Sequence, residues 1–258
     1  MNSIEIKCAS GKTEVYTAPS SWDELSPKQL KIWSAICLQP IPMIEAKKHI
    51  ARLFYCIPNT TFKYLKVGQV LQIADTLSFL FESNQLNKWL IKSVRSGFIR
   101  YHGPNDFLAN LTIAEYRCTE FYYQAYVRTQ EKKWLILLMA TLYREKRKGE
   151  ITDDIREDLT EHGIAKRERH FSKLSPHLLQ ACLLNYEGCR NHLINKYVRA
   201  FKPNQSEQSN EIFDLEEVIE AFAGDKFGSF SETEKTNLHR FFRYMVSSIE
   251  QLEENKAS

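Results

Sequence analysis

The sequence predicts a mainly α-helical protein, a multi-helical bundle with one or two small β-hairpins. Three observations support this fold class. Apolar residues recur at helical spacing through most of the chain. Motifs of the form Ser/Thr-x-x-Glu/Gln, which are typical of helix starts, precede several of these stretches. Of the 258 residues only 9 are Gly and 8 are Pro, and 43% are hydrophobic, which excludes a fibrous chain and one disordered throughout.

A β-hairpin is expected over residues 1–18. Ile4 and Ile6 alternate with charged residues, as in a strand over 3–8 that buries one face. A second strand is expected over 13–17, and the Ala-Ser-Gly-Lys segment between the two supplies the turn.

The chain beyond this hairpin is expected to be mainly helical. Ser26-Pro27-Lys28-Gln29 combines an N-cap residue, a proline at the first helical position and a capping-box glutamine. Further helical regions are expected over 43–56 and 60–82. A second hairpin is expected over 88–102, with Gly97 in its turn.

The middle of the chain is expected to hold the core. Thr112 and Glu115 form a second capping box, which opens a long helix. Another helix is expected over 131–147, and its apolar centre is typical of a central core helix. Residues 149–170 are polar and are expected to form short helices or loop.

The predicted domain organisation has four parts. They are the hairpin over 1–18, a helical main body over 19–202, a flexible acidic linker over 203–212 and a C-terminal helical module over 213–258. A third capping box at Ser231-Glu232-Thr233-Glu234 is expected to start the last helix. So short a module buries little surface alone, so it should dock on the main body or on a partner.

The net charge of +3 conceals two segments of opposite bias. Residues 128–148 hold seven basic and two acidic side chains, whereas 206–220 hold six acidic and no basic ones. Such asymmetry is typical of a surface for a charged partner. A solvated helix face followed by an acidic linker explains the same pattern.

No motif for catalysis, metal binding or membrane insertion is present in the sequence. The six cysteines form no CxxC pair and no signal peptide precedes them, so we expect a reducing compartment and no disulfides. Cys189 and His192 form one helical pair, whereas a closed zinc site needs four ligands. We therefore expect no metal, no cofactor and no enzymatic activity. The longest uncharged apolar run, over 134–142, is too short to cross a bilayer.

Aromatic and basic residues are the candidates for binding a partner. Aromatic residues make up 12% of the chain, and they could serve equally as core packing or as interface anchors. The candidate partner-binding residues are Trp22, Tyr122, Tyr126, Arg144, Lys146, Arg147, Lys148, Phe241 and Phe242.

Several segments together resemble a family. The segment over 18–30, with its Pro-Ser-Ser-Trp-Asp-Glu-Leu-Ser-Pro-Lys-Gln-Leu run, resembles the start of certain phage and prophage tail-region proteins, some of them tail-assembly-chaperone-like. The segments over 140–144, 183–190 and 219–224, with Phe227-Gly228, resemble a group from phages and prophages of Bacteroides-type bacteria. The resemblance carries over no catalytic residue.

The resemblance implies a non-enzymatic phage assembly or adaptor protein that binds a protein partner. It would mask an apolar surface of a phage structural or tail protein in the host-cell cytoplasm. One alternative is a virion structural component, such as a head–tail or tail protein. The other is a nucleic-acid-associated protein that uses the basic clusters over 128–148 and 166–170, which is not favoured because no recognition module is evident. No membrane partner is expected, and the sequence leaves the oligomeric state open.

Overall fold

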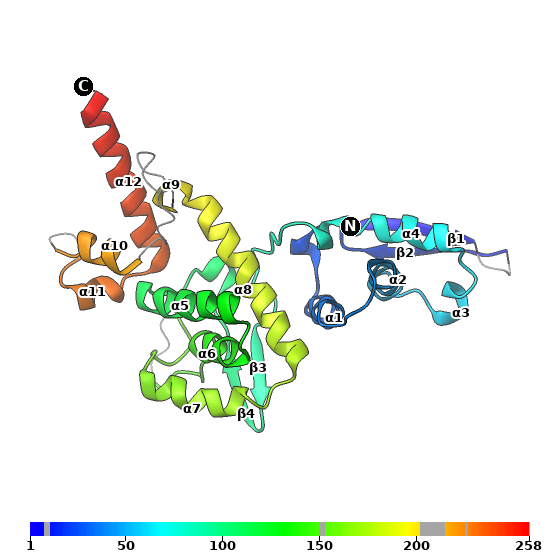
Figure 1. Ribbon diagram of the computed structural model, residues 1–258, viewed down its shortest axis with the longest axis horizontal. Helices are drawn as coiled ribbons and strands as arrows, with labels where there is room; N and C mark the ends of the chain where they lie inside the picture. The colour runs from blue at the N-terminus through cyan, green and yellow to red at the C-terminus, as the bar shows by residue number, and fades with distance from the viewer. Residues whose placement is uncertain (8–10, 150–152, 202–214, 225–226, 258) are drawn as a thin grey trace. The chain divides into compact units, whose positions relative to one another are not determined.

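The structure, a computed structural model, describes residues 1–7, 11–149, 153–201, 215–224 and 227–257. Within this part the chain is mainly helical and carries two separate antiparallel two-stranded sheets (Figure 1). The predicted fold class is confirmed, and each predicted hairpin is present.

The chain divides into two compact units. Unit 1 comprises Met1–Ile91 and Ser175–Gly188, and unit 2 comprises Lys92–Leu174 and Cys189–Ser258. The single main body expected over 19–202 is therefore divided, because the chain leaves unit 1 after Ile91 and returns to it at the start of a later helix. The expected linker over 203–212 lies outside the described residues.

Unit 1 combines one hairpin with short helices. Its elements are β1 (Asn2–Lys7), β2 (Thr13–Ala18), η1 (Trp22–Glu24), α1 (Pro27–Cys37), α2 (Met43–Phe54), α3 (Asn59–Phe62), α4 (Val67–Asp75), η2 (Ser78–Phe81) and the first part of α8 (Pro176–Lys196).

The first helix of unit 1 starts as predicted. The backbone N–H of Gln29 donates to Ser26 Oγ at 3.2 Å, and Gln29 Oε1 accepts from the backbone N–H of Ser26 at 2.9 Å. The reciprocal bonds satisfy two donors that a helix start otherwise leaves unpaired. Leu30, at 0% exposure, then faces the core.

The helical region expected over 60–82 is broken into α3, α4 and η2. Lys66 adopts an extended backbone with ψ 151°, which ends the first piece. The side chain of Gln69 accepts a hydrogen bond from the backbone N–H of Lys66 at 2.9 Å, so a new helix starts there. The apolar stripe that suggested one helix begins at Val70, after this break, so it carried no information about where the helix starts.

Gly188 allows the first part of α8 to approach the loop before β3 closely. A Cβ atom at this position would lie 2.4 Å from the carbonyl oxygen of Leu86. One turn earlier, Asn185 Oδ1 accepts from the backbone N–H of Ile91 at 3.0 Å, and Asn185 Nδ2 donates to the carbonyl oxygen of Lys88 at 2.7 Å. The helix thus pairs the backbone of a buried segment that belongs to neither sheet nor helix.

Unit 2 contains the second hairpin and the longer helices. Its elements are β3 (Ser93–Ser96), β4 (Ile99–His102), η3 (Asp106–Leu108), α5 (Ile113–Thr129), α6 (Lys132–Leu142), α7 (Glu161–Phe171), the rest of α8, α9 (Val198–Phe201), α10 (Leu215–Phe222), α11 (Phe230–Glu234) and α12 (Leu238–Ala257).

Helix α6 is the central core helix of unit 2, as the sequence predicts. It packs between α5 and α7, and its residues from Leu138 to Leu142 are all buried. The predicted continuation of this helix to residue 147 is wrong. After Leu142 the backbone becomes extended, because Arg144 exchanges two backbone hydrogen bonds with His102 of β4, at 2.7 and 3.0 Å.

The C-terminal helices are docked on α5 within unit 2. The backbone N–H of Leu238 donates to the carbonyl oxygen of Leu111 at 2.9 Å, and the backbone N–H of Ile113 donates to that of Thr236 at 3.0 Å. Phe241 and Phe242 are both 0% exposed. The region expected as a separate module over 213–258 therefore contributes buried residues, among them Leu238, Phe241 and Phe242, to the core of unit 2.

The capping box predicted at Ser231 and Glu234 is wrong. Ser229 caps α11, and Glu232 Oε2 accepts from the backbone N–H and the hydroxyl of Ser229, both at 2.8 Å. Glu234 instead pairs with Arg117 of α5 at 2.5 Å. Two overlapping Ser-x-x-Glu motifs occur here, and the ion pair to α5 takes the second glutamate.

Candidate functional site

Unit 2 contains a network of charged side chains buried beneath its hairpin. Glu115 of α5 is 6% exposed, and its two oxygens accept from Arg144 Nη2 at 2.6 Å and from Arg156 Nη2 at 3.0 Å. Both arginines are almost fully buried, at 1% and 0% exposure. Asp154 completes the group by accepting from Arg156 Nη2 at 2.7 Å. Burial of paired charges is tolerated because each arginine has a carboxylate partner.

These buried groups fix the extended segment that follows α6. Arg144 Nη1 also donates to the carbonyl oxygen of Glu157 at 2.7 Å, and Arg156 Nη1 donates to that of Leu142 at 2.9 Å. The backbone N–H of Arg147 donates to Ile155 at 2.8 Å. The segment is therefore held by hydrogen bonds between β4 and residues 155–157, from Arg144 to Arg147.

The hairpin β3–β4 has one buried and one exposed face. On the buried face Tyr101, at 0% exposure, packs its ring against Phe171 of α7 with centroids 4.8 Å apart. Ser96 Oγ donates to the carbonyl oxygen of His170 at 2.9 Å, which ties the hairpin to the end of α7. The exposed face carries Arg95 and Arg100 directly opposite each other.

The turn of this hairpin presents a fully exposed aromatic ring. Gly97 takes a positive φ of 61°, as a two-residue hairpin turn with Gly at its first central position requires. Phe98 follows, and its exposure is 109% of the reference value for a free residue. No ring contact joins Phe98 to another aromatic residue in the part of the chain that the structure describes.

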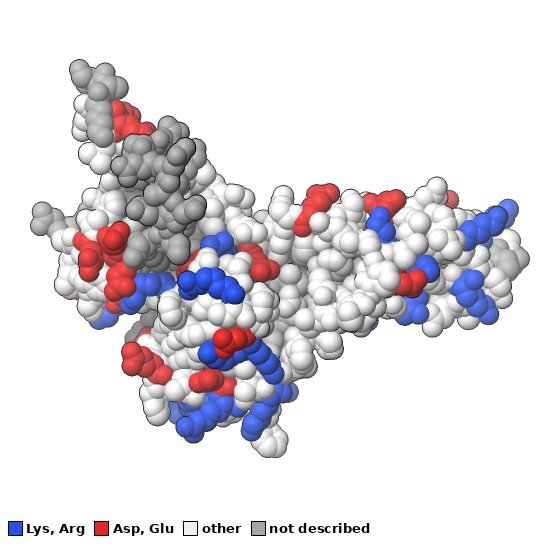
Figure 2. All heavy atoms as spheres, viewed as in Figure 1, with Lys and Arg blue, Asp and Glu red and all other residues white. Residues whose placement is uncertain are grey.

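Six exposed cations lie on this hairpin or on the two segments that are hydrogen-bonded to it, and we call them the basic edge. They come from the hairpin, from the segment after α6 and from the end of α7, and they are Arg95, Arg100, Lys146, Lys148, Arg169 and Lys173. None of the six forms an ion pair with a described residue; the neighbouring Arg147 and Lys166 pair with Asp158 and Glu145. Figure 2 shows blue side chains gathered at this end of unit 2.

His102 has a lowered pKa, to which two cations of the basic edge contribute. Partial burial of its ring lowers the pKa of His102, and the positive charges of Arg100 and Lys146 lower it further. Both cations therefore act on the same imidazole, although they come from segments more than 40 residues apart in the chain. The lowered pKa favours the neutral imidazole of His102. The positive charge of this surface therefore comes from its arginines and lysines.

The structure distributes the nine predicted partner-binding residues among different environments. Trp22, Arg144, Phe241 and Phe242 are buried, so the expectation that their side chains meet a partner at the surface is wrong for these four. Tyr122, Tyr126 and Arg147 are half-buried, and burial raises the pKa of Tyr122 to about 12. Lys146 and Lys148 are exposed and belong to the basic edge.

Sequence reasoning missed Lys173 after α7 and three residues of the hairpin, namely Arg95, Phe98 and Arg100. A signal for the three hairpin residues was present in the sequence. The available signal was their spacing. An arginine lies two residues before a Gly-Phe turn and another lies two residues after it, which places both side chains on one face of a tight hairpin.

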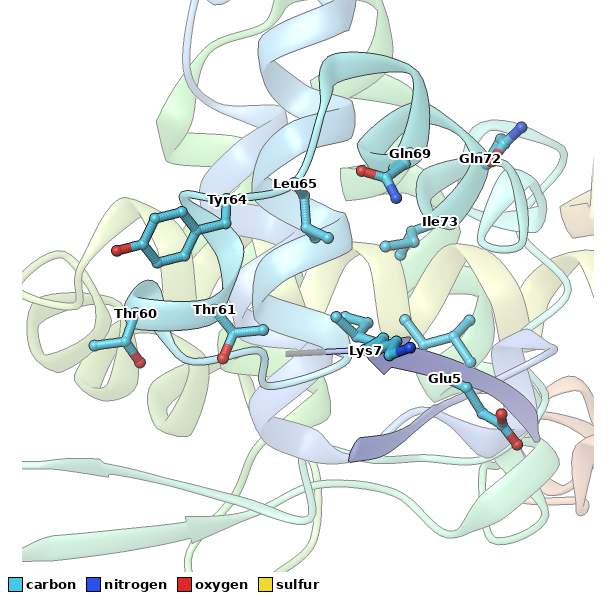
Figure 3. Close-up of a pocket in the computed structure, with 11 residues that line it drawn as sticks. Glu5, Lys7, Thr60, Thr61, Tyr64, Leu65, Gln69, Gln72 and Ile73 are labelled. Atoms are coloured by element: carbon cyan, nitrogen blue, oxygen red, sulfur yellow. The ribbon is translucent and has the colours of Figure 1, made fainter. Parts of the chain in front are cut away.

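Unit 1 carries a different feature, a groove of about 650 Å³ beside β1 (Figure 3). Its walls are formed by residues of β1, of α3 with the turn after it, and of α4. Glu5 and Lys7 are the only charged residues among its lining side chains, and Tyr64, at 71% exposure, stands at its rim. The described lining therefore combines apolar side chains with uncharged polar ones, the apolar ones being Ile4, Ile6, Leu65 and Ile73.

The described residues contain no group of three or more His, Cys, Asp or Glu side chains placed to hold a metal ion. In the same part of the chain, none of the helices has both the length and the hydropathy that crossing a bilayer requires. Comparison with protein-family models, with curated proteins and with solved structures gives no match.

Proposed function

We propose that the protein is a non-enzymatic binding protein of phage assembly and that unit 2 binds nucleic acid through the basic edge. The phage context rests on the sequence resemblance. The nucleic-acid contact rests on one structural observation, the six exposed cations without an acidic partner among the described residues. Phosphate neutralisation by lysine and arginine supplies most of the affinity in non-specific nucleic-acid binding.

The opposed pair Arg95 and Arg100 gives this proposal its strongest support. Like charges directly opposite each other in a sheet destabilise it. A phosphate placed between them would convert this repulsion into two favourable charge-assisted contacts. The basic clusters named from the sequence contribute too, since Lys146, Lys148 and Arg169 all belong to the basic edge.

The test is a titration of labelled DNA and RNA oligonucleotides at several salt concentrations. We expect measurable binding at low ionic strength that weakens steeply as salt is added. The double variant Arg95→Gln/Arg100→Gln should bind at least tenfold more weakly and reduce the slope of log affinity against log salt by about 1.5.

A matched control removes the same charge elsewhere. Lys28→Gln/Lys31→Gln removes two exposed cations from α1 of unit 1 and should leave the affinity unchanged. Equal losses in the two double variants would show that net charge alone drives binding, and the basic edge would then have no special role.

A protein partner is a second candidate function, and the groove of unit 1 favours it. The groove lies beside β1, and an apolar side chain of a partner could occupy it. Tyr64→Glu should abolish capture of a phage structural protein from infected cells, while Val15→Glu, exposed on β2 outside the groove, should not. The proteins of purified particles would separate an assembly factor, which is absent from them, from a virion component.

A further inference from the structure

The side chain of Phe98 is fully exposed, so it has no packing role within the described part of the chain. Its ring is fully exposed at the tip of β3–β4, where burial would contribute about 2 to 3 kcal/mol if a partner covered it. The turn itself needs only the glycine at 97, because the positive φ lies there. A large apolar side chain in this place therefore points to contact with something outside the chain.

The surroundings of Phe98 define the chemistry of that contact. Arg95 lies three residues before Phe98 on one strand and Arg100 two residues after it on the other, and both side chains are exposed. An aromatic ring flanked by cations matches a ligand that has flat apolar faces and negative charges at short intervals. Single-stranded nucleic acid has both, since every base offers a π-face and every linkage a phosphate.

We propose that Phe98 stacks on an unpaired base, so that the basic edge binds single-stranded nucleic acid in preference to duplex. This inference rests on the proposed function, because the cations must hold the strand for the ring to meet a base. In a duplex the base faces are covered by their neighbours. Insertion of Phe98 between them would cost a few kcal/mol of unstacking.

An anionic membrane surface would also attract cations and an aromatic tip, but the arrangement fits it less well. One phenyl ring is a marginal anchor in a bilayer. The six cations come from three separate segments, so together they can contact several phosphates of one strand. Anionic vesicles therefore serve as a competing ligand in the test.

The experiment compares a labelled oligo-dT strand with a DNA duplex of equal length, both titrated with the full chain. Phe98→Ala should weaken binding to the single strand about 5- to 150-fold, which corresponds to the loss of one base–aromatic stack. Binding to the duplex should change less than twofold. Phe98→Trp should retain single-strand binding, and its indole fluorescence should be quenched when oligo-dT is added.

Phe121→Ala is the matched control, since it removes another exposed phenyl ring, from α5, and should leave both affinities unchanged. Equal weakening of single strand and duplex by Phe98→Ala, or no weakening of either, overturns the stacking inference. If Arg95→Gln/Arg100→Gln still loses affinity in that case, the proposed function survives. Binding to phosphatidylserine vesicles without binding to either oligonucleotide overturns both proposals.

Discussion

The carboxylate of Glu115 is shared by two arginines that are buried with it. Replacing Glu115 by Gln would leave Arg144 and Arg156 with only part of their negative charge compensation inside unit 2. Breaking a buried pair by removing one partner costs about 3 to 5 kcal/mol. We therefore expect Glu115→Gln to lower the free energy of unfolding by that amount, measured as a shift in the urea midpoint.

Glu250 provides the control for this measurement. Its pair with Arg199 is open to solvent, with the two side chains 48% and 51% exposed, so Glu250→Gln should cost no more than about 1 kcal/mol. Similar losses in the two variants would mean that burial does not set the contribution of the network.

Asp154 makes the stability of unit 2 depend on pH. Burial alone would raise the pKa of its carboxyl, but hydrogen bonds from Arg156 and the charges of Arg156 and Arg144 outweigh burial and lower it. The folded pKa is then below the unfolded value of about 4. The contribution of Asp154 is therefore complete above about pH 4 and is lost as pH falls through the folded pKa.

The measurement is the urea midpoint between pH 6 and pH 3. We expect Asp154→Asn to be destabilised at pH 6 and to lose less stability than the unsubstituted chain as pH falls. Asp158→Asn is the control, because Asp158 is largely exposed in its pair with Arg147. Parallel curves for the unsubstituted chain and Asp154→Asn would contradict the assignment.

At the scale of elements, α8 depends on the absent side chain of Gly188. Gly188→Ala would place a methyl group 2.4 Å from a carbonyl oxygen, so the backbone of the helix or of the facing loop must shift. We expect a loss of about 1 to 3 kcal/mol in the free energy of unfolding, as for other overpacked sites. Chemical denaturation followed by circular dichroism measures it.

Gly68 near the start of α4 is the matched site. A Cβ there meets nothing within 4 Å and its φ is not positive, so Gly68→Ala should stabilise the protein by about 0.4 to 1 kcal/mol. A change of the same sign at both glycines would contradict the packing argument at Gly188.

Local signals predicted elements well where the motif and the tertiary contacts agree. The box at Ser26 and Gln29 forms as expected. At Thr112 the hydroxyl accepts from the backbone N–H of Glu115 at 3.2 Å, but the carboxylate of Glu115 turns inward to the arginines. The position of Glu115 in the sequence fits both a capping carboxylate and a buried ion-pair partner. Arg144 and Arg156, both more than 25 residues away in the chain, decide between these two roles.

The surface of unit 2 was only partly predictable for the same reason. The sequence indicated basic clusters but not which members would be buried, because Arg144 and Arg167 are indistinguishable from their neighbours by type. Arg167 Nε donates to the carbonyl oxygen of Ala140 at 2.6 Å, and such backbone partners have no sequence signature. The basic edge also needs β3–β4, which lies far from the clusters in the chain.

At the scale of the whole molecule, the C-terminal helices complete unit 2. Removing residues 203–258 deletes two fully buried phenylalanines, Phe241 and Phe242. It also deletes the carbonyl oxygen of Thr236, which accepts from the backbone N–H of Ile113 at the start of α5. Each of the two phenylalanine side chains is worth about 3 to 5 kcal/mol, so the loss approaches the total stability of a typical domain. We expect the truncated chain to lose cooperative thermal unfolding and to bind an apolar dye.

A shorter truncation tests whether length alone matters. Removing residues 251–258 takes away the last part of α12, in which residues 251–255 are exposed, and should leave the melting temperature nearly unchanged. If the chain ending at residue 202 melts as cooperatively as the full chain, the C-terminal helices are a dispensable attachment.

Arg95 and Arg100 lie opposite each other in the hairpin β3–β4. Added salt should therefore have two opposite effects, one on the order of the free hairpin and one on the proposed binding. In the free protein, added ions screen the repulsion between Arg95 and Arg100, so the amide protons of the hairpin should exchange more slowly as ionic strength rises. In the proposed complex with nucleic acid, the same ions would compete for the phosphates and weaken binding. The conditions that best order the free hairpin would thus be those in which the proposed binding is weakest.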